Sequence, residues 1–375
     1  TGEIGVSTAT TADTGSWVGV GMAANGEFVV AWTDKAARDG SSSGIFARRF
    51  SATGAPLWAE TQVNTYTVRD QVHPSVAVSP DGTGVIAWQT WENDTSGSVD
   101  VRARRFNPAG FVGGEIVVAN TPNVSEYEAA AASGPAGTFV VSYTLDTPTA
   151  GQEVRARVFR WFDGAALTDP LVVNDAVTAG NQFDPSVAAD AAGNFVVTWT
   201  SAGRDADGNG IAARRFGPTG TPLGSEFQVN AYTTGSQERP AVSAAAAGNF
   251  VIAWASAGQD GSGYGTYMQR YNAAGQPAGV ETQANAYTTD NQSWPAVGLY
   301  AGGTIAFATE TLGQDGSDWG VSTRVFAEQP TTPSAWPEVG VNTFTAGNQS
   351  GPAVARNAAE TGVNPPAVAG TGTDV

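Results

Sequence analysis

Apolar residues in this chain are gathered in short runs separated by polar, glycine-rich turns, and the pattern repeats along almost its whole length. The clearest copy is Gly193-Asn-Phe-Val-Val-Thr-Trp199, a nearly continuous apolar run that begins directly after a turn. Equivalent runs begin at Gly26, Gly84, Gly137, Gly193, Gly248 and Gly303. The last four of these glycines are 56, 55 and 55 residues apart. A fixed period of this length indicates an array of one supersecondary unit.

Each repeat contains four short strands. In the fourth repeat they cover residues 185–190, 194–199, 211–216 and 226–230, and tight turns join them. The second run is apolar on both faces, which is typical of a strand covered on both sides. No stretch has the periodicity of an amphipathic helix. We therefore predict an all-β protein, a β-propeller of six four-stranded blades of about 55 residues, with spare strands at both termini.

The repeats predict a single propeller domain over residues 1–356 and an extended tail over 357–375. The six repeats lie near residues 17–64, 73–120, 127–174, 184–230, 239–285 and 294–342. Residues 2–7 match a fourth strand and residues 351–356 a first strand, and no second or third strand is expected after the latter. Three interpretations stay open for these spare strands: closure of the ring within one chain, exchange between molecules, or the cut ends of a longer protein.

Three residue types recur at fixed places and predict contacts between blades. Third strands end in an aromatic residue, at Phe50, Phe106, Phe159, Phe216, Tyr271 and Phe326. An arginine stands two residues earlier in five repeats, at Arg48, Arg104, Arg157, Arg214 and Arg324. Fourth strands end in asparagine, at Asn64, Asn120, Asn174, Asn230, Asn285 and Asn342. An arginine cluster suits an acidic sugar, but one arginine on each outer strand favours pairing between blades.

The repeats resemble those of large bacterial secreted and cell-surface proteins. The resemblance rests on segments such as Gly258-Gln-Asp-Gly-Ser-Gly-Tyr-Gly265, Gln269-Arg-Tyr271 and Gln283-Ala-Asn-Ala-Tyr-Thr-Thr289, and it covers nearly the whole chain. It implies an extracellular β-propeller that is often part of a longer protein. It implies no particular activity.

Composition narrows the classes of function. Hydrophobic residues make up 41% of the chain and charged residues 14%, with 47 glycines, as in a folded and turn-rich protein. Cysteine is absent, so disulfides, thiolate metal sites and thiol nucleophiles are excluded. The net charge of −17 opposes binding to nucleic acid. No apolar run approaches the ~20 residues of a membrane-spanning helix. We predict no transmembrane segment and no organic cofactor.

Oxygen-bearing side chains in the longer loops are candidate calcium ligands. Asp205, Asp207 and Asn209 stand at alternate positions of one loop beside glycines, and such a loop wraps oxygen atoms around a hard cation. Sparser versions contain Asp260, Asp315 and Asp318. No glutamate follows at the spacing of an EF-hand, so that identity is excluded. The alternative interpretation is that Asp-Gly and Gly-Ser pairs simply build turns.

The chain has 11 tryptophans, and eight of them fall into two groups. Those at a repeated place on the second strands are predicted to belong to the core: Trp32, Trp88, Trp199 and Trp254. Those near blade entrances or in loops are candidates for contact with a ligand, because an indole face stacks on a sugar ring: Trp17, Trp91, Trp294 and Trp319. The loops after the second strands and between blades share one acidic face, where propellers usually place function.

Catalytic residues do not stand out in the sequence, and we name none. The single histidine, His73, has no second histidine to pair with, and no acidic pair is singled out among 35 acidic residues. We predict an extracellular or cell-surface binding or structural module without catalysis, with calcium as a stabilising ion and assembly through exchange of terminal strands. Its partners would be a glycan or further copies of the chain. The alternative is a lectin or a glycosidase that acts on polysaccharide at the acidic loop face.

Overall fold

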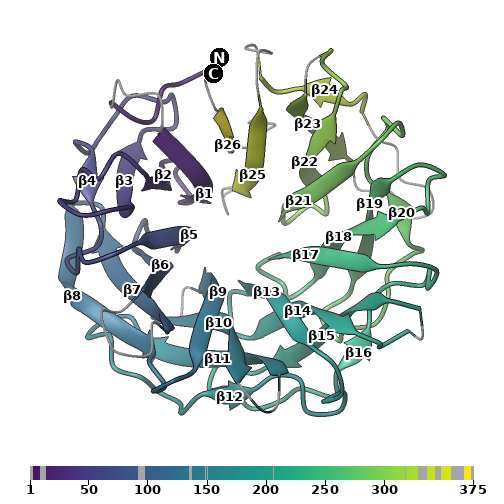
Figure 1. Ribbon diagram of the computed structural model, residues 1–375, viewed down its shortest axis with the longest axis horizontal. Coiled ribbons are helices and arrows are strands. Elements are labelled where there is room, and N and C mark those ends of the chain that lie inside the picture. Colours follow the sequence, from purple (N-terminus) through teal and green to yellow (C-terminus); the bar gives the residue numbers. More distant parts are fainter. Residues whose placement is uncertain are drawn as a thin grey trace.

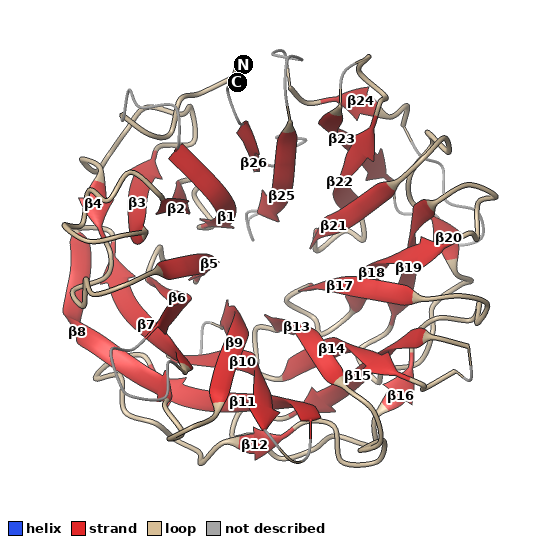
Figure 2. Ribbon diagram, in the orientation of Figure 1, coloured by secondary structure: helices blue, strands red, loops and turns tan. Residues whose placement is uncertain are grey.

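Six four-stranded antiparallel sheets are arranged around a central axis, and each sheet is one blade of a propeller (Figure 1). The structure, a computed structural model, describes residues 3–8, 14–91, 98–134, 137–147, 149, 151–205, 207–316, 318–327, 336–342, 348–355 and 367–372. Every regular element in these ranges is a strand (Figure 2). The described residues accordingly include no helix that could cross a membrane. The predicted all-β propeller of six four-stranded blades is confirmed.

The strands follow one another blade by blade. The first two blades contain β1 (Thr14–Met22), β2 (Phe28–Asp34), β3 (Gly44–Phe50), β4 (Thr61–Gln62), β5 (Gln71–Val78), β6 (Gly84–Trp91), β7 (Val99–Asn107) and β8 (Gly110–Ala119). The next two contain β9 (Ser125–Ser133), β10 (Thr138–Thr147), β11 (Gly151–Arg160), β12 (Leu171–Val172), β13 (Gln182–Ala189), β14 (Phe195–Ala202), β15 (Asn209–Phe216) and β16 (Phe227–Gln228). The last two contain β17 (Gln237–Ala244), β18 (Phe250–Ala257), β19 (Tyr264–Tyr271), β20 (Thr282–Gln283), β21 (Gln292–Leu299), β22 (Ile305–Leu312), β23 (Trp319–Phe326) and β24 (Val339–Gly340).

Strand order within a blade follows the chain, so the first strand lies nearest the axis and the fourth at the outer rim (Figure 1). Each second strand is covered on both faces by the blades beside it, and for this reason its residues are apolar without alternation. The four tryptophans that recur at one position of these strands are at most 3% exposed: Trp32, Trp88, Trp199 and Trp254. The prediction that they belong to the core is confirmed.

The third-strand arginines join neighbouring blades. Arg104 Nη1 donates a hydrogen bond of 2.9 Å to the carbonyl oxygen of Val63 on the preceding blade. The equivalent bonds join Arg157 to Val118 at 3.0 Å, Arg214 to Val173 at 3.0 Å and Arg324 to Ala284 at 3.2 Å. Several of these guanidinium groups also lie over the aromatic ring that ends the same strand, at 5.1 to 5.4 Å from the ring centroid. The prediction that the arginines pair blades is confirmed.

A two-stranded sheet occupies a seventh position between the sixth and first blades (Figure 1). It consists of β25 (Gln349–Ala355) and β26 (Ala367–Gly372), which pair in antiparallel register. β25 packs against β21 on one side and β1 on the other. The sequence predicted the first of these strands but an extended tail in place of the second. The tail folds back at 367–372, because a lone inner strand would leave its backbone edge unpaired.

Residues 3–8 hold the position of a fourth strand without forming one. Arg48 Nη1 donates to the carbonyl oxygen of Val6 at 3.4 Å, which repeats the contact between blades described above. The Thr8 amide donates to Glu60 at 2.6 Å, just as the Ala231 amide donates to Glu281 at 2.6 Å. The predicted strand over residues 2–7 is therefore absent from the described residues 3–7. A fourth strand needs a third strand beside it, and the seventh sheet contributes only two strands in the described part of the chain.

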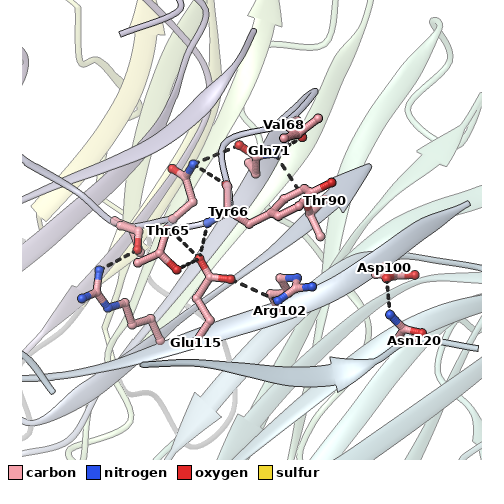
Figure 3. A network of polar contacts seen from close by, with 12 residues as sticks. Thr65, Tyr66, Val68, Gln71, Thr90, Asp100, Arg102, Glu115 and Asn120 are labelled. Atoms are coloured by element: carbon pink, nitrogen blue, oxygen red, sulfur yellow. Dashed lines mark hydrogen bonds and ion pairs between the residues drawn. The ribbon is translucent and has the colours of Figure 1, made fainter. Parts of the chain in front are cut away.

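The repeated asparagine closes the corner between one blade and the next. Asn230 Oδ1 accepts from the Ile211 amide at 2.8 Å, and its Nδ2 donates to the carbonyl oxygen of Tyr232 at 2.8 Å and to Gln237 Oε1 at 2.9 Å. Figure 3 shows part of the corresponding corner between the first two blades, where Glu115 accepts from the Tyr66 amide at 3.0 Å. Such a corner fixes the place where each inner strand begins.

Replacing Asn230 by alanine is expected to lower the free energy of unfolding by about 2–4 kcal/mol. The substitution removes the acceptor of the buried Ile211 amide and the donor to Gln237 Oε1, and each buried polar group that loses its partner costs about 1–3 kcal/mol. Urea unfolding followed by fluorescence measures the change. The control is Asn181→Ala at an exposed loop position, for which a change of about 0.5 kcal/mol or less is expected. Equal effects of the two substitutions would contradict the role of the corner.

Candidate functional site

Each inner strand carries a β-bulge at the same place, and the residue there has a positive φ angle. The register of the first strand shifts at this point in all six blades and in β25. The φ angles are 55° at Trp17, 57° at His73, 56° at Glu128, 52° at Asp184, 56° at Arg239, 50° at Trp294 and 65° at Gly351. We call these seven residues the axial ring, because the inner strands surround the axis (Figure 1).

The axial ring combines backbone strain with unlike side chains. A left-handed conformation costs a residue other than glycine about 1–3 kcal/mol, and such residues concentrate at functional sites. A bulge also turns its side chain away from the regular alternation of the strand. The position that ends the fourth strand is asparagine in all six blades, whereas the axial ring holds Trp, His, Glu, Asp, Arg and Gly. The backbone conformation of the axial ring therefore repeats from blade to blade, while its side chains differ. This combination makes the axial ring the candidate site.

Side chains of the preceding blade hold the strained backbone in place. The His73 amide donates to Thr33 Oγ1 at 3.2 Å, and the Arg239 amide donates to Thr200 Oγ1 at 3.2 Å. Gln89 Oε1 accepts the Glu128 amide at 3.1 Å. These acceptors sit at equivalent positions of the second strands. The bulge is thus fixed from the neighbouring blade and does not depend on a ligand.

Glu128 and Asp184 form a pair of carboxyl groups. Glu128 Oε2 accepts from the Thr144 hydroxyl at 2.7 Å and from the Asp184 amide at 2.8 Å, and the two carboxyl groups are hydrogen-bonded to each other. Burial and the nearby negative charge of Glu128 raise the pKa of Asp184 to about 8, although the positive charge of Arg239 opposes the shift. The pair therefore favours the state in which one of its two carboxyl groups holds a proton.

Arg239 and Glu310 continue the site beyond the pair. The Arg239 guanidinium lies 4.6 Å from the centroid of the Trp294 ring. Glu310, on the second strand of the sixth blade, is 6% exposed and accepts from the Gly351 amide at 2.5 Å. Burial raises the pKa of Glu310 to about 7, while that amide and the charge of Arg239 oppose the shift. Arg239 thus acts electrostatically on both Asp184 and Glu310.

His73 contributes a neutral ring. Its Nδ1 lies 3.1 Å from Gln89 Oε1, and its ring centroid is 3.8 Å from that of Trp17 in an edge-to-face arrangement. Burial lowers the pKa of His73 to about 4, so the imidazole is uncharged at neutral pH. The sequence noted that this single histidine has no second histidine to work with. The structure places it beside a tryptophan on one side and a glutamine on the other.

Two of the four tryptophans proposed as ligand contacts belong to the axial ring. Trp17 and Trp294 are each 43% exposed. Trp91 ends β6 and Trp319 begins β23, so the structure places these two on second and third strands and not on the inner strands. Contact of any of the four with a ligand stays a prediction.

The proposed calcium ligands bind different partners within the protein. Asp205 Oδ2 accepts from Asn230 at 2.9 Å, Asp207 accepts from the Gly235 amide at 3.1 Å, and Asn209 donates to Glu238 at 2.8 Å. Asp260 and Asp315 accept from the repeated asparagines of their own blades, and Asp318 is exposed. The described residues contain no group of three or more acidic or histidine side chains able to hold a metal ion. Calcium binding stays a prediction.

Sequence reasoning missed Glu128, Asp184, Arg239 and Glu310. The sequence did contain one signal for the axial ring: a proline follows five of its seven residues. These five are His73, Asp184, Arg239, Trp294 and Gly351. A residue before proline normally prefers an extended conformation. Nothing in the sequence pattern marks the bulge that reverses this preference.

No protein-family model matches the sequence, and no curated protein matches it. Solved structures match it in fold. An α-L-arabinanase from Penicillium chrysogenum in complex with arabinobiose is 16% identical, with a TM-score of 0.57 over 83% of this chain and 93% of that one. An α-L-arabinofuranosidase from Fusarium graminearum in complex with an iminosugar inhibitor is 12% identical, with a TM-score of 0.54 over 79% and 88%. A Dyadobacter fermentans protein of unknown function is 12% identical, with a TM-score of 0.54 over 80% and 91%. At these identities the likeness concerns the propeller fold.

Proposed function

We propose that this protein is a glycosidase that cleaves a polysaccharide or oligosaccharide at the axial ring. One observation carries the proposal: Glu128 and Asp184 meet as a buried pair of carboxyl groups, joined by the hydrogen bond from the Asp184 amide to Glu128, in a ring that also holds two exposed tryptophans. A lone acidic residue in water would be ionised at this pH. The pair supplies the acid that glycoside hydrolysis requires.

Hydrolysis of a glycoside needs two carboxyl groups with different roles. One donates a proton to the leaving oxygen, and the other acts as a base toward water or as a nucleophile. Asp184 takes the first role. Glu310 takes the second, because its pKa of about 7 lets it accept a proton near neutral pH. Arg239 acts on both carboxyl groups, and its charge stabilises the ionised form of each.

The non-catalytic module favoured by the sequence gains no support from the site. The sequence singled out no acidic pair, whereas the bulges of the inner strands bring Glu128 and Asp184 together. The resemblance to secreted and cell-surface repeats, the extracellular location, the calcium ion and the assembly through terminal strands all remain predictions. The fold neighbours named above include proteins described as an arabinanase and an arabinofuranosidase, so arabinose-containing glycans are the first substrates to test.

Release of reducing sugar from a panel of polysaccharides tests the proposal. Arabinan, arabinoxylan, xylan and galactan are incubated with the protein and with Glu310→Gln. We expect release from at least one of them and a loss of about 100-fold or more in the variant, as for removal of a general base. The control is Asp163→Asn, a carboxylate in a turn of the outer rim. Absence of release from every substrate, or release that survives Glu310→Gln, would overturn the proposed hydrolysis.

A further inference from the structure

One position of the axial ring has no side chain, and both of its neighbours are tryptophans. Gly351 lies on β25, between β21 and β1. Trp294 on β21 and Trp17 on β1 occupy the equivalent positions on either side. Blade order therefore places a gap of one side chain between two indole groups.

The outer sides of both indoles are already occupied. Arg239 packs on Trp294 at 4.6 Å from the ring centroid, and blade order puts it on the side away from Gly351. His73 packs on Trp17 with the ring centroids 3.8 Å apart, again on the side away from Gly351. Both indoles nevertheless remain 43% exposed, whereas the four core tryptophans are at most 3% exposed. The exposed surface of the pair is thus turned toward the gap or toward solvent.

A carboxyl group lies beneath the gap. Glu310 Oε1 accepts the Gly351 amide at 2.5 Å, and the side chain is 6% exposed. A carboxyl group in this place accepts hydrogen bonds from hydroxyl groups and repels an acidic ligand. The ammonium group of Lys35 lies 5.7 Å from the centroid of the Trp17 ring and adds a hydrogen-bond donor beside that indole.

We propose that Trp17, Gly351 and Trp294 form a slot that binds one neutral sugar residue of a glycan between the two indole groups, with Glu310 beneath it. The slot rests on the proposed function in taking a carbohydrate as its ligand, and it shares Glu310 with the proposed hydrolysis. The apolar faces of the sugar contact the indoles, and its hydroxyl groups reach the carboxyl group. Above the pKa of Glu310, about 7, its negative charge disfavours the carboxylate of a uronic acid, and binding is therefore compared at pH 8.

The repeat itself supplies the substitution that fills the slot. Six other positions of the ring carry a side chain at φ angles of 50° to 57°, and Gly351 has 65°. The bulge therefore accepts a tryptophan, as it does at Trp17 and Trp294. Gly351→Trp is expected to fold normally and to occupy the slot, and Gly351→His, which copies His73, is a second variant of intermediate size.

Binding is measured by tryptophan fluorescence and by calorimetry with arabinotetraose, xylotetraose, cellotetraose and tetragalacturonate. Each titration uses the unchanged protein and Asp184→Asn, so that binding is separated from turnover. We expect at least one neutral tetrasaccharide to bind and tetragalacturonate to bind about tenfold more weakly or worse. Trp17→Ala and Trp294→Ala should each weaken binding about tenfold, and Gly351→Trp about 100-fold. Trp336→Ala, which removes a tryptophan that is 53% exposed in the segment before β24, should leave binding unchanged.

Three results would overturn the slot: no binding of any neutral tetrasaccharide, equal binding by Gly351→Trp, or equally tight binding of tetragalacturonate. Thermal unfolding of both Gly351 variants shows whether the bulge has accepted the new side chain, and Gly351→His decides the question if Gly351→Trp unfolds. If a tetrasaccharide binds and the slot variants weaken its binding, but no sugar is released, the proposed hydrolysis is refuted and the slot is supported. If Gly351→Trp releases sugar as fast as the unchanged protein, the slot is refuted and the proposed hydrolysis is supported.

Discussion

Replacing Asp184 by asparagine is expected to lower the rate of polysaccharide cleavage by about 100-fold to 10,000-fold, the range that a general acid contributes. The amide keeps the size of the carboxyl group and still donates a hydrogen bond to Glu128. It has no acidic proton to give to the leaving oxygen. The fold is therefore retained while the acid is lost.

A glycoside with a nitrophenyl leaving group distinguishes a lost acid from a distorted site. Such a leaving group departs without protonation, so Asp184→Asn should retain most of its activity on that substrate. In the unchanged protein, cleavage of polysaccharide should fall as the pH rises through about 8, where Asp184 loses its proton. Equal losses on both substrates, or a profile that is flat through this range, would show that Asp184 is not the acid.

Stability is expected to decrease by several kcal/mol as the pH rises from about 5 to about 8.5. Three carboxyl groups have pKa values raised mainly by burial: Asp184 to about 8, and Glu126 and Glu310 to about 7. Between its unfolded pKa near 4 and its folded pKa, each group holds a proton in the folded chain that it has lost in the unfolded chain. Their stabilising contribution is complete below pH 4 and disappears as the pH passes the folded values. One proton corresponds to about 1.4 kcal/mol for each pH unit.

Other shifted groups change this slope only in part of the range. The lowered pKa of His73, about 4, means that the unfolded chain binds one more proton between pH 4 and 6.5, which opposes the carboxyl groups there and has no effect above. The lowered pKa values of Glu60 and Asp70 contribute stability that is already complete at pH 5. Urea unfolding at a series of pH values measures the slope. The triple variant Glu126→Gln, Asp184→Asn, Glu310→Gln should be nearly flat above pH 6.5, and an unchanged slope would refute the assignment.

The fold could be predicted because the architecture repeats. A run such as Gly193-Asn-Phe-Val-Val-Thr-Trp199 recurs with little change, since every second strand must fill the same space between two blades. The core tryptophans and the bridging arginines followed from that repetition. The residues that repeat with the blade period are those that pack between blades, and this packing is the same in each blade.

The site could not be predicted for the same reason. Glu128 and Asp184 are 56 residues apart and meet only because neighbouring blades bring their bulges together. The candidate catalytic positions are those at which the repeat varies, so a search for recurrence passes over them. The seventh sheet escaped prediction in part because β26, Ala-Val-Ala-Gly-Thr-Gly, lacks the bulky residues of the other second strands.

The axial ring makes this molecule a natural starting point for protein engineering. Seven positions share one backbone geometry, and together they already accept an indole, an imidazole, two acids, a guanidinium and a bare hydrogen. Mutating them together would leave the packed interior between blades unchanged in sequence, because that interior is formed by other positions, such as Val187 and Val297 of the inner strands and the tryptophans of the second strands. A combinatorial library confined to these seven codons would therefore vary recognition on a constant scaffold, with selection acting on one small surface at the centre of the disc.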